Sequence, residues 1–465
     1  MTKALDLNRR RLLRNGLHAL VWGGAATTLL PALARNAVSS HASVPLRPVA
    51  DAVTGRELLQ LPEGFRYFTF GWAGDPLLGG GRVPVSADGM GVVAQQGQRI
   101  RLVRNHEINQ VRGTFAPGQA GCYDPLCGGG TVTLDLDLEN ETLVSADASL
   151  TGTVLNCAGG VTPWGSWLSC EEAVHLNGDA LGGINDHERM LDHGFVFEVP
   201  ADGRSDGKPI KDMGLFRHEA VAIDPASGNA YLTEDQYTQA GFYRFIPKTR
   251  GTYADGGELQ MMRVKQQPDL RKDVPRKQPM DVDWVTIDDP LRGRIDSDDK
   301  IGKGISQQGI DQGATRFTRL EGCAYTDGKI YFTSTDGGEA QAGQVFVYDI
   351  ESSQLRLVYE IEAAERADFD YPDNIIPAPG GGLIVCEDSA LRGPGNGQAL
   401  YWLTPEQKPV RLAVNQVKLG GRDLSGAEWA GCCFSADGKW LFANIYTPGF
   451  SVAITGPWDS LWGSV

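Results

Sequence analysis

The stretch Thr326-Asp-Gly-Lys-Ile-Tyr-Phe-Thr-Ser-Thr-Asp336 contains the pattern that decides the fold. An Asp-Gly turn comes first, a run of apolar and β-branched residues follows, and polar side chains end the run. Short runs of this composition between glycine turns are typical of β-strands. The stretch therefore predicts a tight turn and a buried strand that carries an acidic residue at its end.

Five other stretches of the chain repeat this pattern. The six are residues 96–107, 162–172, 226–235, 326–336, 379–388 and 436–445. A second apolar run follows several of them, as at 195–199, 242–246 and 345–349. A small antiparallel sheet that recurs along a chain is typical of a β-propeller, so we predict an all-β fold with six blades. A large β-sandwich, or two separate β domains, is the alternative.

The repeats set the expected domain boundaries. We expect a β-propeller catalytic domain over residues 61–465, preceded by an N-terminal extension at 35–60. Residues 248–312 are polar, charged and interrupted by Gly and Pro, which predicts a long insertion between two blades.

The N-terminus predicts the cellular compartment. Asn8-Arg-Arg-Arg-Leu-Leu-Arg14 precedes an apolar stretch, and Ala32-Leu-Ala34 provides a small-x-small cleavage site. Residues 1–34 therefore resemble a twin-arginine signal peptide, with an ordinary secretory signal as the alternative. We expect a periplasmic or secreted protein that meets the twin-arginine translocase during export and has no stable membrane anchor.

The charge balance limits the partners. With 58 acidic and 43 basic side chains the net charge is −15, which argues against a nucleic-acid partner. An anionic substrate would need cations to neutralise it. The 7 histidines are too few for a metal site built mainly from histidine. We expect a monomer.

Acidic residues gather at the ends of the repeated strands. They are Glu107, Glu171, Glu172, Glu234, Asp235, Glu387 and Asp388, and Glu219, Glu321 and Asp373 precede further strands. Equivalent strand ends meet at the centre of a propeller, where so many like charges require protonation or bound cations. Oxygen ligands in this number favour Ca²⁺, and Cys170, beside Glu171, favours a transition metal as well. The alternative is that exposed turns attract acidic residues.

Two further features concern phosphate and cysteine chemistry. Arg217 and Arg319 each stand two residues before an acid, so each could bind two oxygens of a phosphate or form an ion pair with that acid.

Cys122 and Cys127 flank a turn and could pair. The chain lacks the Gly-x-Ser-x-Gly motif of serine hydrolases and the Walker loop of nucleotide-binding proteins.

Taken together, the motifs resemble the PhoX-type alkaline phosphatases, which are calcium-dependent secreted enzymes. The resemblance runs in order from about residue 60 to 460. It rests on Arg104-Asn-His-Glu107, the run Asn156-Cys-Ala-Gly-Gly to Cys170-Glu-Glu172, Arg217-His-Glu219, Arg319-Leu-Glu321, Pro372-Asp-Asn374, Cys386-Glu-Asp388, and the tail from 434 to 458. The chain departs from the family at Ala220, where glycine is usual, and at Tyr446, where glutamine is usual.

The resemblance implies specific roles. It implies a six-bladed propeller with an iron and calcium (Fe³⁺ and Ca²⁺) cluster at its centre, with Cys170 as an iron ligand. The implied cluster carboxylates are Glu219, Glu321 and Asp373, and the implied calcium ligands are Glu171, Glu387 and Asp388. Arg319 is the expected catalytic residue, and Arg319 and Asn156 are expected to contact the substrate phosphate. Glu107, Glu172, Glu234 and Asp235 complete the predicted metal set.

The function that follows is a metal-dependent phosphomonoesterase. It would release phosphate from small organic esters, and because no activated serine or threonine is visible, the expected nucleophile is a metal-held hydroxide or oxide. The alternative is a calcium-binding propeller with a lactonase-like or a non-catalytic binding role. A calcium-only propeller needs neither a thiol ligand nor Arg319, so these residues favour the phosphatase.

Overall fold

A computed structural model describes residues 44–110, 113–118, 121–176, 191–293 and 304–464. These residues form β-strands with two short α-helices, α2 (Gly304–Asp311) and α3 (Trp458–Trp462), and one 3-10 turn, η2 (Lys211–Met213). The predicted all-β class is confirmed. The expected export signal lies outside the described residues, and within them no helix is long and apolar enough to cross a membrane.

Most of the strands belong to five antiparallel sheets. One contains β4 (Ala87–Gln96), β5 (Arg99–His106), β6 (Gly129–Asp137) and β7 (Thr142–Thr153), and the next contains β8 (Asn156–Val161), β9 (Ser166–Glu171) and β10 (Val196–Pro200). The largest contains β11 (His218–Ile223), β12 (Ala230–Glu234), β13 (Phe242–Thr249), β14 (Thr252–Val264), β15 (Met280–Thr286), β19 (Gln354–Glu360), β18 (Gln344–Asp349), β17 (Lys329–Ser334) and β16 (Leu320–Thr326).

The last two large sheets combine N-terminal and C-terminal strands. One contains β1 (Leu46–Ala50), β2 (Glu57–Pro62), β23 (Pro409–Asn415), β22 (Ala399–Leu403), β21 (Leu383–Glu387) and β20 (Pro372–Pro377). The other contains β26 (Trp429–Phe434), β27 (Trp440–Ile445), β28 (Phe450–Thr455) and β3 (Arg66–Phe70). A small pair, β24 (Lys418–Leu419) and β25 (Arg422–Asp423), completes the set. Because β3 pairs with β28, the beginning and the end of this region are held in one sheet.

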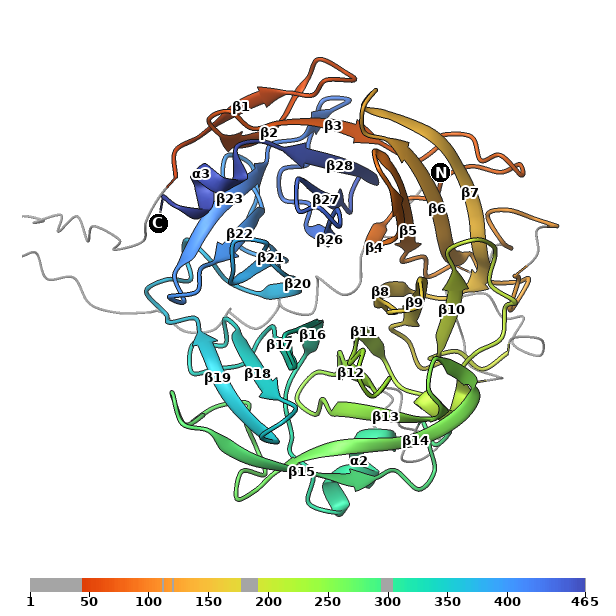
Figure 1. The fold of residues 1–465 in the computed structure, drawn as a ribbon, viewed down its shortest axis with the longest axis vertical. Helices are drawn as coiled ribbons and strands as arrows, with labels where there is room; N and C mark the ends of the chain where they lie inside the picture. Colours follow the sequence, from red (N-terminus) through yellow and green to blue (C-terminus); the bar gives the residue numbers. More distant parts are fainter. Residues whose placement is uncertain (1–43, 111–112, 119–120, 177–190, 294–303, 465) are drawn as a thin grey trace, which may run out of the picture. The chain divides into compact units, whose positions relative to one another are not determined.

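Six strands lie innermost and follow one another in a closed cycle. β4 lies beside β8, and the cycle continues through β11, β16, β20 and β26 before it returns to β4. Figure 1 shows the sheets arranged around this common centre. The strand that faces the centre is therefore the one that directly precedes each of the six repeated stretches.

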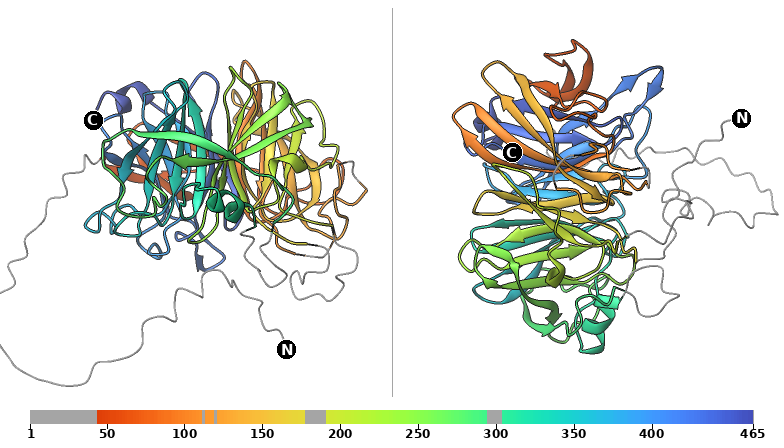
Figure 2. Two further views of the ribbon diagram at one scale, coloured as in Figure 1. Left: turned by 90° about the horizontal axis from the view of Figure 1, so that it is seen from below. Right: turned by 90° about the vertical axis from the view of Figure 1, so that its right-hand side faces the viewer.

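The nine-stranded sheet spans two of these units. β15 pairs with β14 on one side and with β19 on the other, and so joins the two. β14, β15 and α2 come from the segment expected to be an insertion, and α2 contacts β14, far from the common centre of the sheets (Figure 1 and Figure 2). The segment expected to be an N-terminal extension supplies β1 and β2, which pair through β2 with β23.

Hydrophobic layers fill the space between neighbouring sheets. Alternate residues of β11 to β14 meet alternate residues of β16 to β19, with Phe242, Phe332 and Phe346 stacked at the centre of that layer. A second layer, around Trp402 and Trp429, lies between the sheet of β20 to β23 and the sheet of β26 to β28. These layers hold the inner strands in fixed positions and so determine which side chains meet at the centre.

Candidate metal centre

Equivalent positions on the inner strands carry metal-ligand side chains. In each of five units the first residue of the inner strand pairs with the last residue of the next strand, and a register irregularity follows at once. The pairs are Ala87 with His106, Asn156 with Glu171, His218 with Glu234, Leu320 with Ser334, and Pro372 with Glu387. The residue just after each pair is left outside the ladder, as at a β-bulge. Those residues are Asp88, Cys157, Glu219, Glu321 and Asp373.

The next position on most of the inner strands is small, which lets neighbouring strands approach closely. It is Gly or Ala in five of the six strands (Gly89, Ala158, Ala220, Gly322 and Gly431) and Asn374 in the sixth. A Cβ atom at Gly89 would lie 2.5 Å from the Cα of Ala158, and one at Gly322 would lie 2.5 Å from the carbonyl oxygen of Asp373. A side chain there would push the strands apart, so these residues bring the ligands of adjacent strands together.

A second set of acids joins from the ends of the neighbouring strands. Glu107, Glu172, Asp235 and Asp388 each directly follow the last residue of β5, β9, β12 or β21. Ligand atoms of Glu107, Cys157 and Glu172 lie within 4.8 Å of one another, and so do those of Glu219, Glu321 and Asp373. We call the two sets together the central cluster: Asp88, Glu107, Cys157, Glu172, Glu219, Asp235, Glu321, Asp373 and Asp388.

The central cluster is electrostatically unfavourable without cations. Burial, followed by repulsion from Glu321, raises the pKa of Glu219 well above its usual range. Burial, followed by repulsion from Asp388, raises the pKa of Asp373 to about 8. Glu219 is fully buried, and its Oε2 has no hydrogen-bond partner among the described residues. Buried carboxylates in this arrangement need protons or metal ions, so the residues fit a metal centre.

Cys157 is the thiol that lies in the central cluster. Its Sγ donates a hydrogen bond to Glu219 Oε1 at 3.2 Å and lies 3.7 Å from Asp88 Oδ2. Burial, with a smaller effect from the neighbouring carboxylates, raises the pKa of this thiol. A bound cation would favour the thiolate and so offset that penalty.

Arg319 lies at the rim of the central cluster. Its Nε and Nη2 each lie 3.2 Å from a carboxylate oxygen of Asp235, and Nη2 also bonds to Glu321. The side chain keeps 27% of its surface exposed, so solvent reaches it. The backbone has φ 40°, an uncommon conformation for a residue other than glycine. Ser86, Leu155 and Tyr371 precede their inner strands with similar φ values, so this conformation belongs to the repeat.

The acids Glu171-Glu172, Glu234-Asp235 and Glu387-Asp388 form three doublets of adjacent residues. The structure differs from the sequence-based expectation for the first acid of each doublet. Glu171, Glu234 and Glu387 end their strands and turn away from the centre. Glu234 Oε2 accepts hydrogen bonds from Gly241 N at 2.8 Å and Tyr243 Oη at 2.7 Å. Successive side chains on a strand alternate between faces, so only the second acid of each doublet reaches the centre.

Glu171 and Glu387 are held by the protein in the same way. Glu171 accepts hydrogen bonds from the backbone N–H groups of Val154, Gly194 and Phe195. Glu387 forms a buried ion pair with Arg392, with contacts from 2.7 to 3.2 Å. These two acids hold loops in place, whereas Glu172 and Asp388 lie in the central cluster.

Cys170 and Asn156 are also placed away from the expected chemistry. Cys170 is fully buried in a hydrophobic cluster with Leu168 and Val196, because its side chain points to the opposite face of β9 from Glu171. Asn156 is buried as well; its Nδ2 donates to Ser169 Oγ at 2.9 Å and its Oδ1 accepts from Thr153. The amide is thus already bonded within the protein.

Sequence reasoning missed Asp88 and Cys157 and gave Tyr446 no role. Asp88 and Cys157 share the register position of Glu219, Glu321 and Asp373, and an alignment of the six inner strands would have found both. Tyr446 donates a hydrogen bond to Glu107 Oε2 at 2.5 Å and so adds a phenol to the edge of the central cluster. Cys122 and Cys127, which could have paired, are free thiols in the structure.

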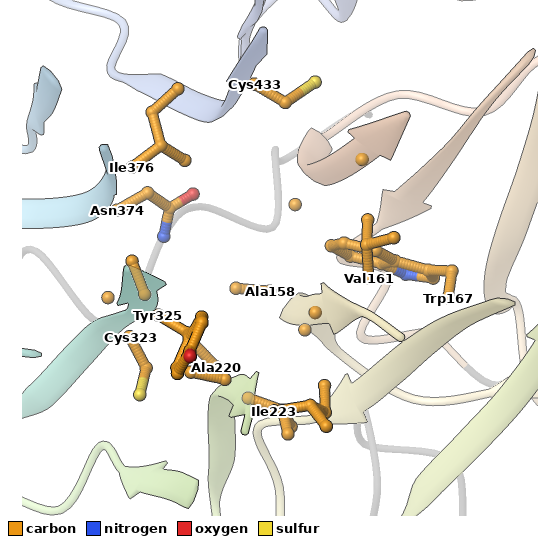
Figure 3. Close-up of a pocket in the computed structure, with 18 of the residues that line it drawn as sticks. Ala158, Val161, Trp167, Ala220, Ile223, Cys323, Tyr325, Asn374, Ile376 and Cys433 are labelled. Carbon is orange, nitrogen blue, oxygen red and sulfur yellow. The ribbon is translucent and has the colours of Figure 1, made fainter. Parts of the chain in front are cut away.

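A cavity of about 470 Å³ lies between the inner strands on the other side of the small residues. It is lined by the part of each inner strand that follows the small residue, including Val161, Ile223, Cys323 and Ile376, together with Trp167 of β9 (Figure 3). No acid of the central cluster lines it. The cavity is largely apolar and is separate from the carboxylates, which precede the small residues along each strand.

Comparison with known proteins identifies the family. The model of the alkaline phosphatase PhoX family matches residues 44–146 and 128–449. PhoX from Pseudomonas fluorescens, solved in complex with vanadate, a transition state analogue, superposes with a TM-score of 0.62 at 18% identity, over 89% of this chain and 98% of that one. A gluconolactonase from Xanthomonas campestris gives a TM-score of 0.41 at 11% identity, over 89% and 95%. No protein of curated function matches the sequence. The family match spans most of the chain, and the chain therefore belongs to the PhoX alkaline phosphatase family.

Proposed function

We propose that the central cluster binds iron and calcium ions and that phosphomonoesters are hydrolysed at these ions. As a member of the PhoX family the protein is a metal-dependent phosphoric monoester hydrolase, not a calcium-binding propeller of another function. The observation that carries the proposal is the convergence of buried carboxylates on Cys157, with one oxygen of Glu219 left without a hydrogen-bond partner in the described part of the chain.

The chemistry of the donors suggests how the ions are divided. The group of Glu107, Cys157 and Glu172 combines sulfur with oxygen, which supports iron there. The group of Glu219, Glu321 and Asp373 offers only carboxylate oxygens, which supports calcium. When bound, these ions supply positive charge for the phosphoryl oxygens and activate the attacking oxygen.

Arg319 is the residue of this chain best placed to bind the phosphoryl group. Its guanidinium is partly exposed beside the central cluster, and Asp235 and Glu321 fix its orientation. The bonds to these two acids use Nε and both N–H groups of Nη2, which leaves the two N–H groups of Nη1 to donate to a phosphate. The guanidinium would stabilise the negative charge that develops on the phosphoryl group during its transfer. Arg319 is not itself one of the proposed metal ligands.

Replacing Arg319 by alanine is expected to lower kcat/KM for a phosphomonoester about 30- to 1,000-fold, because a charge-assisted contact made mainly in the transition state is lost. The iron and calcium content of the variant should equal that of the wild type. Arg319→Lys should restore only part of the activity, since a single ammonium group cannot bind Asp235, Glu321 and a phosphate together as the guanidinium can. The measurement is kcat/KM and metal content on the same preparation.

The ion pair with Asp235 and Glu321 suggests a second role for Arg319, which is to balance the charge of these acids. The same experiment separates this role from phosphate binding. If Arg319 only balances these acids, the alanine variant would lose stability or metal while turnover per loaded site stays normal. Near-normal kcat/KM per bound metal would remove Arg319 from the substrate site.

We also propose that export proceeds through the twin-arginine route to the periplasm or medium. The support is the Arg9-Arg10-Arg11 run before the apolar segment, together with a metal centre that needs a folded protein. Changing Arg9, Arg10 and Arg11 to lysine should retain the protein in the cytoplasm. Normal amounts of this variant outside the cytoplasm, measured by fractionation and immunoblotting, would reject the route.

The architecture that we propose is a six-bladed propeller over residues 61–465 in a monomer. The closed cycle of six inner strands supports six blades, with β15 as a bridge between two of them. An experimental structure with a different number of sheets around the axis would reject the blade count. A mass other than that of one chain in light scattering would reject the monomer.

A further inference from the structure

Outside the central cluster, a second group of buried donors lies next to β9 and β10. Asp124 and Cys127 are brought together by the turn Asp124-Pro-Leu-Cys127, in which Cys127 N donates to Asp124 O at 3.1 Å and Leu126 N donates to Asp124 Oδ1 at 2.9 Å. His193 approaches them from the segment before β10. His193 and Cys127 are fully buried, and Asp124 is 1% exposed.

Glu171 fixes the orientation of the His193 ring. His193 Nδ1 donates to Glu171 Oε1 at 2.7 Å, so Nε2 is directed at the other two residues. Nε2 lies 3.4 Å from Cys127 Sγ and 3.6 Å from Asp124 Oδ2. Three electron-pair donors of different kinds, nitrogen, sulfur and oxygen, therefore face one another away from solvent, with all their ligand atoms within 4.8 Å of one another.

Both distances from Nε2 are compatible with a bound ion, and the longer one, to Asp124, exceeds a direct hydrogen bond, whereas 3.4 Å to Cys127 Sγ also fits a bond from the thiol. A charge-assisted bond from histidine to a carboxylate is about 2.7 to 2.9 Å long, well short of the 3.6 Å between Nε2 and Asp124 Oδ2. A tetrahedral ion with bonds of about 2.0 to 2.3 Å to nitrogen, oxygen and sulfur holds its donors about 3.3 to 3.6 Å apart. The Cys127 and Asp124 distances to His193 are of this size.

We infer that Asp124, Cys127 and His193 form a second metal site for a divalent ion of the Zn²⁺ type, separate from the central cluster. A carboxylate that receives the other ring N–H of a ligating histidine is typical of zinc sites, and Glu171 has that position here. Nitrogen and sulfur donors disfavour calcium. The described residues supply three of the donors.

The site has a structural consequence for the central cluster. The ion would tie the Asp124–Cys127 turn to the segment that carries His193, and both to the end of β9 through Glu171. Glu171 is followed directly by Glu172 of the central cluster. Zinc at this site would thus hold the backbone that presents Glu172, while it takes no part in the chemistry itself.

The test is the metal content of the full-length exported protein, measured by plasma mass spectrometry after growth with zinc. The wild type is expected to hold about one zinc per chain, and Cys127→Ala and His193→Gln are expected to lose it. Cys122→Ala, which removes an exposed neighbouring thiol, should keep it. Cys157→Ala should also keep zinc while it loses iron, so failure of this site and failure of the central cluster give different results.

Unchanged zinc in Cys127→Ala, or wild-type protein without zinc, would overturn the inference. If Cys127→Ala does not fold, Cys157→Ala protein loaded with Co²⁺ decides the question. Its near-ultraviolet spectrum should contain thiolate-to-cobalt charge-transfer absorption, because the thiol of the central cluster has been removed and Cys127 remains. Absence of that absorption would equally overturn the site.

Discussion

Replacing Cys157 by alanine is expected to remove iron from the protein and to lower phosphomonoesterase activity by at least about 100-fold. Cys157 provides the sulfur of the central cluster, 3.2 Å from Glu219. Loss of a ligand costs more than the 10- to 100-fold typical of residues that only support one. The measurement is iron content, visible absorbance and kcat on the same preparation.

Cys170→Ala is the matched control, because the same atoms are removed from a neighbouring strand of the same motif. Cys170 packs against Leu168 and Val196, so its loss should cost about 1 kcal/mol of stability and leave iron content and turnover per folded molecule unchanged. If Cys170→Ala loses iron and Cys157→Ala keeps it, the assignment of the thiol ligand is reversed.

Chelation is expected to abolish activity and to make stability fall as the pH rises. Without cations the carboxylates of the central cluster remain buried beside one another, which raises the pKa of Asp373 to about 8 and that of Glu219 well above its usual range. An acid whose pKa is raised in the folded state favours folding below its unfolded pKa of about 4. That contribution is lost as the pH rises through the folded value.

The metal-free protein should therefore melt at progressively lower temperature between about pH 4 and pH 8, because buried Asp373 and Glu219 lose the protons that favour their folded state. The metal-loaded protein should not share this trend, because bound cations favour the ionised carboxylates. The measurement is Tm against pH for both forms, with Ca²⁺ added back. Equal Tm values at pH 8, with full activity after chelation, would mean that the central cluster does not depend on metal.

The sequence was sufficient to predict the all-β class and the convergence of acids, because turn and strand patterns are local. It did not predict which acid of a doublet faces the centre. That depends on strand register, and a shift of one residue exchanges the two faces. Glu171 and Glu172 are adjacent, yet one holds a loop and the other joins the central cluster.

The choice between two cysteines as the thiol ligand also depends on strand register. Cys157 and Cys170 lie in one motif, and the two glutamates after Cys170 made it the more attractive ligand. Only the pairing of β8 with β9 shows that Cys157 occupies the register position of Glu219, whereas Cys170 points into the core. Asp88 was missed for a related reason, since the repeats were compared by their second strands, and Asp88 lies on a first strand.

The proposed phosphatase chemistry requires iron and calcium ions in the central cluster, and anomalous X-ray diffraction of the exported wild-type protein tests whether they are there. Data collected on either side of the iron absorption edge should give a peak about 2.3 Å from Cys157 Sγ, and calcium should lie between the carboxylates of Glu219, Glu321 and Asp373 at about 2.3 to 2.6 Å. An iron peak beside Cys170, or no anomalous peak among these residues, would contradict the account.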